Sequence, residues 1–356
     1  MLSYNILDSF SSIITKWYEL NKRELPWRNT QDAYKIWLSE IILQQTRVNQ
    51  GLNYYYRFIE RFPDVQSLAV AEEQEVLKLW QGLGYYSRAR NIHATAKMIK
   101  ASHNSIFPTK YEDIIKLKGI GEYTAAAISS FAYNEPYAVV DGNVFRVLSR
   151  VFGIETPIDS NAGKKEFTQL ANTLLNKQNP AIHNQAIMEF GALQCVPVQP
   201  LCENCVLNVA CVAYKEEVVQ DLPKKSKKTK QRDRHFNYLF IKNGDNTYLQ
   251  QRKGKDVWEN LYEFPLIETE TEIDFSELIQ IPAYKSIFEG VKNIEISKDS
   301  FAVKHVLSHQ KIYTKFYTLE INSENKALKR YTIISFNRLP NLPISRLTEL
   351  FLNQLK

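Results

Sequence analysis

The chain has 356 residues, of which 44% are hydrophobic and 24% charged, and this length and composition predict a globular protein of two or three domains. Its 12 glycines and 13 prolines are too few for a disordered or fibrous protein. The formal net charge of +6 is informative about a polyanionic partner only once its position in the chain is known.

The positive charge lies in one short stretch. Residues 1–221 hold 22 basic and 23 acidic side chains, residues 222–235 hold seven and one, and residues 236–356 hold 16 and 15. The middle stretch has too few apolar residues to pack, so we expect a solvated basic linker between two nearly neutral domains. A simple connector and a segment that contacts phosphates both remain open.

No apolar run approaches the roughly 18 residues of a membrane span, and the first ten residues lack the pattern of a signal peptide. We therefore expect a cytosolic protein without a membrane partner. Disulfides are rare in that compartment, so the four cysteines require another explanation.

The two predicted domains differ in their patterns. Residues 1–221 carry apolar residues at helical spacing, separated by short breaks rich in glycine, proline, asparagine and aspartate. The predicted helices cover residues 34–48, 73–83, 87–100, 112–117, 123–133, 143–153, 164–176 and 184–194. Residues 236–356 predict a smaller α+β domain, with strands at 236–243, 247–252, 304–321 and 330–336, a hairpin turn at 243–246 and a final helix at 345–355.

All four cysteines fall within 17 residues, at Cys195, Cys202, Cys205 and Cys211. Four thiolates this close in a reducing compartment indicate a metal centre. Zinc sites usually pair two tight knuckles, whereas this C-x6-C-x2-C-x5-C spacing has one, and ligation by cysteine alone suits a [4Fe–4S] cluster. A four-cysteine zinc site and unligated cysteines stay open as alternatives.

A glycine hairpin and two carboxylates are further candidates for chemistry. Gly119 and Gly121 separate two predicted helices, and exposed N–H groups there, with a helix start, can hold one phosphate. Glu40 interrupts an apolar helical face, and Asp141 precedes a helix. A desolvated carboxyl can act as a general acid, while one held ionised by helix N-terminal N–H groups can stabilise a cation, which is the pair that glycoside hydrolysis requires. An ordinary helix turn, a buried polar residue and a helix N-cap are the alternatives.

Six segments of the first domain resemble the MutY-type adenine DNA glycosylases of the endonuclease III superfamily: LPWRN (25–29), WLSEIILQQTRV (37–48), WQGLGYYSRARN (80–91), LKGIGEYTAAA (117–127), VVDGNVFRVLSR (139–150) and NQAIMEFGALQC (184–195). The resemblance implies a helix–hairpin–helix fold with a cluster loop at 195–211. It implies that Glu40 protonates the five-membered ring of adenine and later activates water. It also implies that Asp141 stabilises the sugar cation, assisted by Asn143 and Tyr123.

The resemblance also assigns DNA contacts. Gln45, Thr46 and Tyr85 correspond to residues that fill or wedge the gap left by an extruded base. Residues expected to line the adenine pocket are Leu25, Trp27 and Arg28, with Arg23, Gln185 and Glu189 as further candidates. The loop at 196–201 has no lysine or arginine, which departs from the family's basic cluster loop.

Tyr123 separates two reaction types. The bifunctional endonuclease III branch has a lysine at the matching hairpin position, where its amine attacks the sugar. Tyrosine cannot form that Schiff base, and Lys118 precedes the glycines. We therefore expect a monofunctional glycosylase that leaves an abasic site, with a bifunctional glycosylase/lyase as the alternative.

The second domain carries a resemblance of its own. The segment VWENLYEFP (257–265) resembles the Nudix-like C-terminal domain of the same family, but the R-E-x-x-E-E core of Nudix hydrolases is missing. Leu307, Ser308 and His309 match the family's triplet that meets 8-oxoguanine, with leucine in place of the usual phenylalanine. A plain β-hairpin is the alternative.

Together these features predict a multidomain enzyme: an all-α helix–hairpin–helix domain (1–221) with a hairpin at 117–124 and an iron–sulfur loop, a linker (222–235), and an α+β Nudix-like domain (236–356). The expected activity is hydrolysis of the N-glycosidic bond of adenine mispaired with 8-oxoguanine or guanine in double-stranded DNA, by a monomer. A non-catalytic lesion-binding protein, a Nudix hydrolase and a zinc structural protein are the other classes considered.

Overall fold

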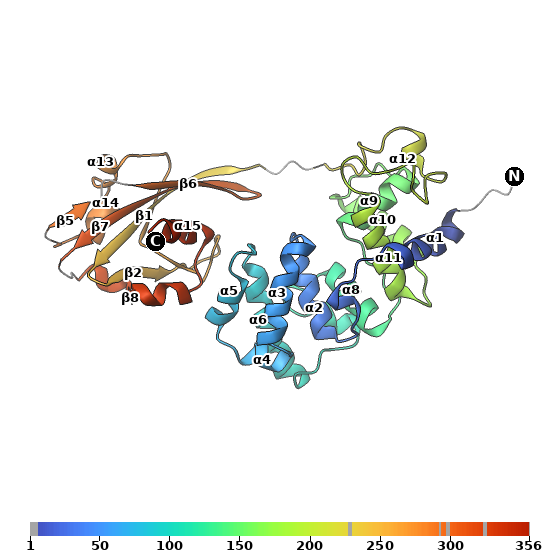
Figure 1. Ribbon diagram of the computed structural model, residues 1–356, viewed down its shortest axis with the longest axis horizontal. Coiled ribbons are helices and arrows are strands. Elements are labelled where there is room, and N and C mark those ends of the chain that lie inside the picture. The colour runs from blue at the N-terminus through green and yellow to red at the C-terminus, as the bar shows by residue number, and fades with distance from the viewer. Residues whose placement is uncertain (1–5, 227–229, 292, 297–299, 323–325, 356) are drawn as a thin grey trace. The chain divides into compact units, whose positions relative to one another are not determined.

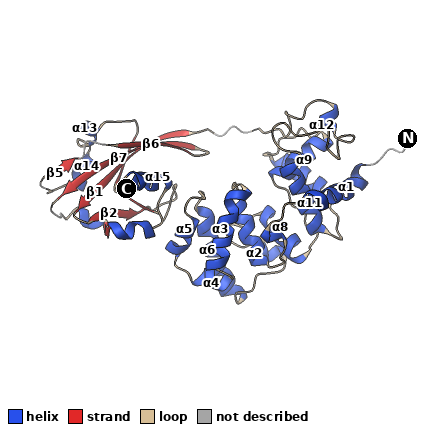
Figure 2. Cartoon of the chain, in the orientation of Figure 1, coloured by secondary structure: helices blue, strands red, loops and turns tan. Residues whose placement is uncertain are grey.

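The structure is a computed structural model that describes residues 6–226, 230–291, 293–296, 300–322 and 326–355. Its contacts divide the chain into two units, one made of Met1–Val70 and Asn91–Lys228 and the other of Ala71–Arg90 and Thr229–Lys356. The helices of the first unit and the strands of the second are distinguished by colour in Figure 2. None of the described helices combines the length and the apolar character that a membrane span requires.

The first unit is helical (Figure 1). Its helices are α1 (Ile6–Asn21), α2 (Ala33–Leu43), α3 (Val48–Arg61), α4 (Val65–Val70), most of α6 (Ser87–His103), α7 (Tyr111–Ile114), α8 (Glu122–Tyr133), α9 (Gly142–Phe152), α10 (Asn161–Leu174), α11 (Pro180–Leu193) and α12 (Val212–Lys215), with a 3-10 turn at Pro26–Arg28.

Several helix contacts build this unit, and two sets of them position the site. Helix α11 packs against α1, α8 and α9, and α2 packs against α8. On α9 the buried residues Val144, Val147, Leu148 and Val151 follow the i, i+3, i+4, i+7 pattern, so one stripe of this helix faces the core. The contact between α2 and α8 places the C-terminal part of one helix beside the N-terminal part of the other, which positions the site described below.

The second unit is an eight-stranded mixed sheet with short helices. The strands are β1 (Arg232–Asn243), β2 (Asn246–Gln251), β3 (Tyr262–Glu263), β4 (Leu266–Thr269), β5 (Ile294–Ile296), β6 (Phe301–Val306), β7 (Gln310–Ile321) and β8 (Thr332–Ser335). The helices are α5 (Glu73–Trp80), α13 (Phe275–Leu278), α14 (Pro282–Ile287) and α15 (Arg346–Gln354), with 3-10 turns at Leu328–Arg330 and Phe336–Asn341.

Strands β1 and β7 form the centre of the sheet. They pair in parallel from Arg232 opposite Gln310 to Lys242 opposite Glu320, and the other strands pair antiparallel. The predicted turn at 243–246 is confirmed: Asn243 pairs with Asn246, and Gly244 has the positive φ that such a turn requires. The predicted strand 304–321 is a hairpin of β6 and β7 that turns at residues 307–309.

The structure differs from the sequence prediction in missed helices and in several boundaries. Helices α1 and α3 were not predicted. Helix α2 ends at Leu43 because Gln45 has a φ of 56°, which a right-handed helix does not accommodate. Strand β1 begins at Arg232, so the last residues of the predicted solvated linker lie in the sheet, and Arg234 is buried. Lys227 and Lys228 of that linker lie outside the described residues.

Candidate active site

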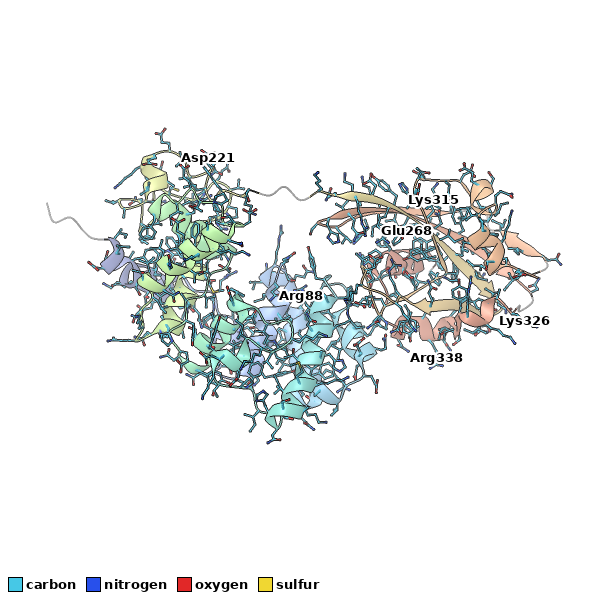
Figure 3. The ribbon with its side chains drawn as sticks, turned by 180° about the vertical axis from the view of Figure 1, so that it is seen from behind. Arg88, Asp221, Glu268, Lys315, Lys326 and Arg338 are labelled. Carbon is cyan, nitrogen blue, oxygen red and sulfur yellow. The ribbon has the colours of Figure 1, made fainter. Side chains whose placement is uncertain are left out.

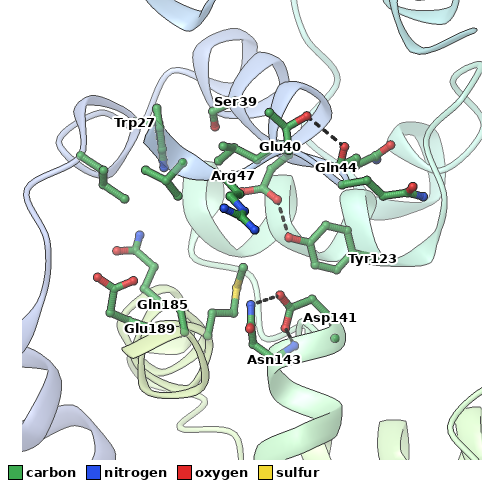
Figure 4. Close-up of a pocket in the computed structure, with 18 of the residues that line it drawn as sticks. Trp27, Ser39, Glu40, Gln44, Arg47, Tyr123, Asp141, Asn143, Gln185 and Glu189 are labelled. Carbon is green, nitrogen blue, oxygen red and sulfur yellow. Dashed lines mark hydrogen bonds between the residues drawn. The ribbon is translucent and has the colours of Figure 1, made fainter. Parts of the chain in front are cut away.

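A cavity of about 920 Å³ opens in the first unit between α2, α8, α9 and α11 (Figure 4). Many of the side chains predicted from the sequence line it, although they come from five separate segments. They are Arg23, Leu25, Trp27, Arg28, Glu40, Gln45, Thr46, Tyr123, Asp141, Asn143, Gln185 and Glu189. The helix packing thus brings together residues that are up to 166 positions apart.

Glu40 is a buried carboxyl at the wall of this cavity. It lies in the last turn of α2 and is only 7% exposed. Burial raises the pKa of Glu40 to about 7, as does the nearby Asp141, although the hydrogen bond from Tyr123 and the charge of Arg28 oppose the rise. A carboxyl with this pKa holds a proton near neutrality and can release it to a substrate.

Tyr123 is the partner of Glu40. It stands in the first turn of α8, and its hydroxyl donates a 2.6 Å hydrogen bond to Glu40 Oε2. Burial and the two neighbouring carboxyls raise the pKa of Tyr123 well above its ordinary value. Tyr123 therefore keeps its proton and acts as a hydrogen-bond donor rather than as a base.

Asp141 is both the N-cap of α9 and a wall of the cavity, so the two roles weighed from the sequence coincide. Its Oδ1 accepts hydrogen bonds from the backbone N–H groups of Asn143 (2.9 Å) and Val144 (2.8 Å), and its Oδ2 accepts one from Asn143 Nδ2 (2.7 Å). Burial raises the pKa of Asp141, while these three donors and Arg146 oppose the rise. The donors are the partners that an ionised carboxylate prefers.

Arg146 is a buried residue of the site that sequence reasoning missed. Its Nη2 donates to Asn143 Oδ1 at 2.8 Å, so the amide of Asn143 must turn its Nδ2 toward Asp141. Its Nε donates to the carbonyl oxygen of Cys195 at 2.6 Å. The available signal was an arginine three residues after Asn143, on a helix whose apolar residues Val144, Val147, Leu148 and Val151 form a core-facing stripe.

A buried ion pair forms another part of the wall. Glu189, on α11, accepts from Arg23 (2.6 Å) and Arg28 (2.7 Å). Burial would raise the pKa of Glu189, but the hydrogen bonds from the two arginines overcome it and lower the pKa to about 2. The cavity therefore contains a carboxyl that is protonated near neutrality and another that is ionised.

Two predicted DNA-contacting residues have strained backbones. Gln45, in the turn after α2, has a φ of 56°, and Tyr85, in the second unit, has a φ of 45°. Non-glycine residues in this region cost free energy and occur preferentially at functional sites. The positive φ angles of Gln45 and Tyr85 are therefore of the kind found at ligand-binding sites.

The two hairpin glycines have different roles. Gly119 has a φ of 77°, and a Cβ there would approach Asn91 to 2.7 Å, so only glycine fits. Gly121 has ordinary extended backbone and is the N-cap of α8, with no atom within 4 Å of an added Cβ. The open space at Gly121 leaves the start of α8 accessible to a phosphate.

The four cysteines line one small cavity beside α9 and α11. Arg150 Nη1 donates to Cys195 Sγ (3.5 Å), and the backbone N–H of Leu207 donates to Cys205 Sγ (3.5 Å). Burial raises the pKa of Cys205 to about 11 and also raises the pKa values of Cys202 and Cys211. Within the described ranges, no group of three or more His, Cys, Asp or Glu side chains is placed so that it could hold a metal ion.

The second unit presents the remaining predicted residues. Ser308 and His309 are exposed in the β6–β7 turn, and Leu307 is half-buried. The Ser308 hydroxyl is hydrogen-bonded to that of Tyr85, which belongs to the same unit. These residues line a cavity of about 550 Å³ together with Trp258.

Comparison with known proteins relates this geometry to a family. Residues 38–176 match the HhH-GPD superfamily of base excision DNA repair proteins, and residues 237–354 match the NUDIX domain. An adenine DNA glycosylase of Buchnera aphidicola subsp. Schizaphis graminum is 39% identical over 261 residues, which cover 73% of this chain and 75% of that protein. A second, from subsp. Baizongia pistaciae, is 36% identical over 319 residues, 88% and 86% of the two chains.

The chain belongs to the adenine DNA glycosylase family. The human adenine DNA glycosylase is 39% identical over 214 residues, 58% of this chain and 39% of that one. A thermostable thymine-DNA glycosylase of solved structure is 28% identical, with a TM-score of 0.56 over 61% of this chain and 100% of its own. A non-covalent endonuclease III–DNA complex, 20% identical with a TM-score of 0.53, has the same fold over 61% of this chain and 99% of its own.

Membership in the adenine DNA glycosylase family confirms the predicted architecture, a helix–hairpin–helix domain followed by a Nudix-like domain. It also confirms the predicted enzyme class, an adenine DNA glycosylase. The assignments of individual residues, of the cluster and of the mispaired base remain predictions.

Proposed function

We propose that this adenine DNA glycosylase family member excises adenine mispaired with 8-oxoguanine or guanine in double-stranded DNA, by hydrolysis alone. The observation that carries the proposal is the pairing of Glu40 with Tyr123 in the same cavity as Asp141. Glu40, with a pKa near 7, can supply the proton that the leaving base needs. The hydrogen-bonded carboxylate can supply the negative charge that stabilises the sugar cation.

In this reaction Glu40 gives its proton to a nitrogen of the five-membered ring of adenine. The C1′–N9 bond then breaks with its electron pair moving to the base, and positive charge develops on the sugar. The ionised Asp141, whose oxygens are fixed by Asn143 and the start of α9, stabilises that cation. Glu40, now ionised, takes a proton from water, and the hydroxide adds to C1′ to leave an abasic site.

The same cavity supports hydrolysis without a lyase step. A lyase of this superfamily requires an amine nucleophile, and Tyr123 occupies the hairpin-helix position where an attacking lysine would stand. Among the residues that line the cavity in the described part of the chain there is no lysine. The DNA product is therefore an unbroken strand with an abasic site.

The extruded adenine would lie against Leu25, Trp27 and Arg28, which line the cavity. Gln45 and Thr46 would occupy the gap in the duplex, Tyr85 would wedge the opposite strand, and the Gly119–Gly121 hairpin would hold a phosphate. Ser308 and His309 would read the edge of 8-oxoguanine, with Leu307 as an apolar contact that has no aromatic face.

We also infer that Cys195, Cys202, Cys205 and Cys211 hold a [4Fe–4S] cluster. The all-sulfur donor set, the shared small cavity and the N–H donors to Cys195 and Cys205 suit a cluster. A bound cluster would supply positive charge that keeps the otherwise high-pKa thiols ionised. Its role is to hold the loop at 195–211, and the reaction above uses none of its electrons.

Iron and sulfide analysis of anaerobically purified protein tests the cluster. About four irons per chain with brown absorbance are expected. Stoichiometric zinc without iron would exclude it. Chelation of the iron should increase hydrogen exchange in the loop at 195–211 before it affects α2, because this loop is the segment that the cluster would hold.

The activity itself is tested with a duplex that carries adenine opposite 8-oxoguanine, under single-turnover conditions, with half of each sample treated with hot alkali. Strand breaks that require alkali support the proposal. Breaks without alkali would indicate a lyase, and no adenine release in either half would indicate a binding protein. The rates of adenine release from an A:G duplex and an A:T duplex, measured in parallel, give the specificity for the base opposite adenine. Sedimentation tests the expectation that the enzyme is a monomer. We expect the enzyme to act on the DNA of the nucleoid, in the cytoplasm.

A further inference from the structure

The buried guanidinium of Arg234 is linked through Gln310 to the exposed turn of residues 307–309. Arg234, on β1, is 8% exposed and donates to Glu268 (2.6 and 2.6 Å) and to Asp256 (2.8 and 2.9 Å). Its remaining donor, on Nη1, goes to Gln310 Oε1 at 3.1 Å. All five N–H groups of an arginine are therefore used, and two carboxylates hold the guanidinium in one orientation (Glu268 is labelled in Figure 3).

This contact fixes the side-chain amide of Gln310, which is 1% exposed. Its Oε1 must face Arg234, because the reversed amide would place its NH2 group against an N–H donor. Gln310 Nε2 is consequently a donor. It lies 2.9 Å from Nε2 of His309, which must then be the acceptor.

A neutral imidazole has one N–H donor and one acceptor nitrogen. Because Nε2 of His309 accepts from Gln310, the proton of the neutral ring is on Nδ1. The ring is held on an ordered turn, since Leu307 N–H donates to the Gln310 carbonyl (2.8 Å) and Arg232 N–H donates to the His309 carbonyl (3.1 Å). The rest of the His309 side chain is exposed.

We propose that Gln310, oriented by Arg234, is a positioning residue that makes His309 present an Nδ1–H donor to the lesion. The inference rests on the proposed reading of 8-oxoguanine by this turn. The C8 carbonyl oxygen of 8-oxoguanine is an acceptor, whereas guanine has a C–H group at that position. Guanine offers an acceptor only at the neighbouring N7, so an Nδ1–H donor directed at the C8 substituent favours the oxidised purine over guanine.

The tautomer is measured by long-range 1H–15N correlation spectra of histidine-labelled full-length protein at about pH 8, where an ordinary histidine is neutral. His309→Asn assigns the signal. Wild type should show protonated Nδ1. Gln310→Glu replaces the donor with a carboxylate, so the proton should move to Nε2, and Gln310→Met should release the ring to the Nε2–H form that free histidine favours. Gln280→Glu, an exposed change with the same charge, is the matched control and should leave the signal unchanged.

The spectra have two outcomes that overturn the inference: an Nε2–H ring in the wild type, or an Nδ1–H ring in both Gln310 variants. Thermal melting shows whether each variant is folded. If one of the two Gln310 variants does not fold, the other still tests the inference.

A binding assay in parallel compares duplexes that contain 8-oxoguanine or guanine opposite a non-cleavable adenine analogue. Gln310→Glu should lower the preference for 8-oxoguanine about tenfold, the effect of one lost hydrogen bond. An altered tautomer with an unaltered preference would overturn the role of Gln310 in reading. A wild type without any preference, but with protonated Nδ1, would instead refute the proposed lesion reading and leave the tautomer assignment standing.

Discussion

The hydroxyl of Tyr123 donates a 2.6 Å hydrogen bond to Oε2 of Glu40, across 83 residues of sequence. It joins the start of the hairpin helix α8 to the last turn of α2. Because this bond favours the ionised carboxylate while burial disfavours it, Tyr123 limits how far the pKa of Glu40 rises. The helix that follows the glycine hairpin thereby sets the acidity of the proposed proton donor.

Replacement of this hydroxyl should change the pH profile. In Tyr123→Phe the pKa of Glu40 should rise further, so the alkaline limb of the single-turnover rate should move to higher pH, with a rate about tenfold lower at its optimum. Tyr133→Phe, on the same helix, is the control. An alkaline limb in the same place would show that Tyr123 does not set the acidity of Glu40.

Loss of the proposed acid should abolish catalysis without loss of binding. Glu40→Gln should lower the single-turnover rate of adenine release by about 10²–10⁴-fold, the usual contribution of a general acid, and leave the dissociation constant for lesion DNA nearly unchanged. Glu24→Gln, an exposed carboxyl of the same unit, should retain wild-type activity. Full activity of Glu40→Gln would remove Glu40 from its role.

The same substitution should stabilise the protein. A carboxyl whose pKa is about 7 in the folded state and 4.5 in the unfolded state destabilises the fold as pH rises through this range, and not below it. Glu40→Gln should therefore raise the free energy of unfolding by up to about 3 kcal/mol at pH 8, with the gain shrinking toward pH 4.5. Urea unfolding at both pH values measures the effect. Equal gains at both values would contradict the assignment of the raised pKa.

The basic linker should contribute to DNA binding and to its salt dependence, but not to the chemical step. Replacement of Lys224, Lys225 and Lys230 by glutamine should reduce the slope of log K against log salt by up to about 3, because each lost phosphate contact removes about 0.9. The single-turnover rate at saturating protein should not change. Glutamine at the exposed Lys164, Lys165 and Lys177, none of which lines the cavity, makes the same charge change elsewhere. An unaltered slope in the linker variant would make it a connector only.

The structure shows that some positive charges of the basic stretch at 222–235 are paired within the protein. Lys224 is paired with Glu155, and Arg234 is buried in an ion-pair network of the sheet. The positive excess of the chain is thus partly structural, which composition could not reveal because it does not distinguish a solvated arginine from a buried one.

The amino-acid sequence was sufficient to predict the two-domain order, the helical and α+β classes, the metal-site spacing of the cysteines and the chemical types of the candidate residues. Local patterns suffice for these properties, since periodicity, turns and ligand spacing are short-range. Three further properties depend on the folded arrangement. Glu40 is buried beside Tyr123. The ionised Glu189 is paired with Arg23 and Arg28. Gln310 connects Arg234 to His309. The protonation of a side chain depends on which groups surround it in space, and in this protein those groups come from segments far apart in the chain.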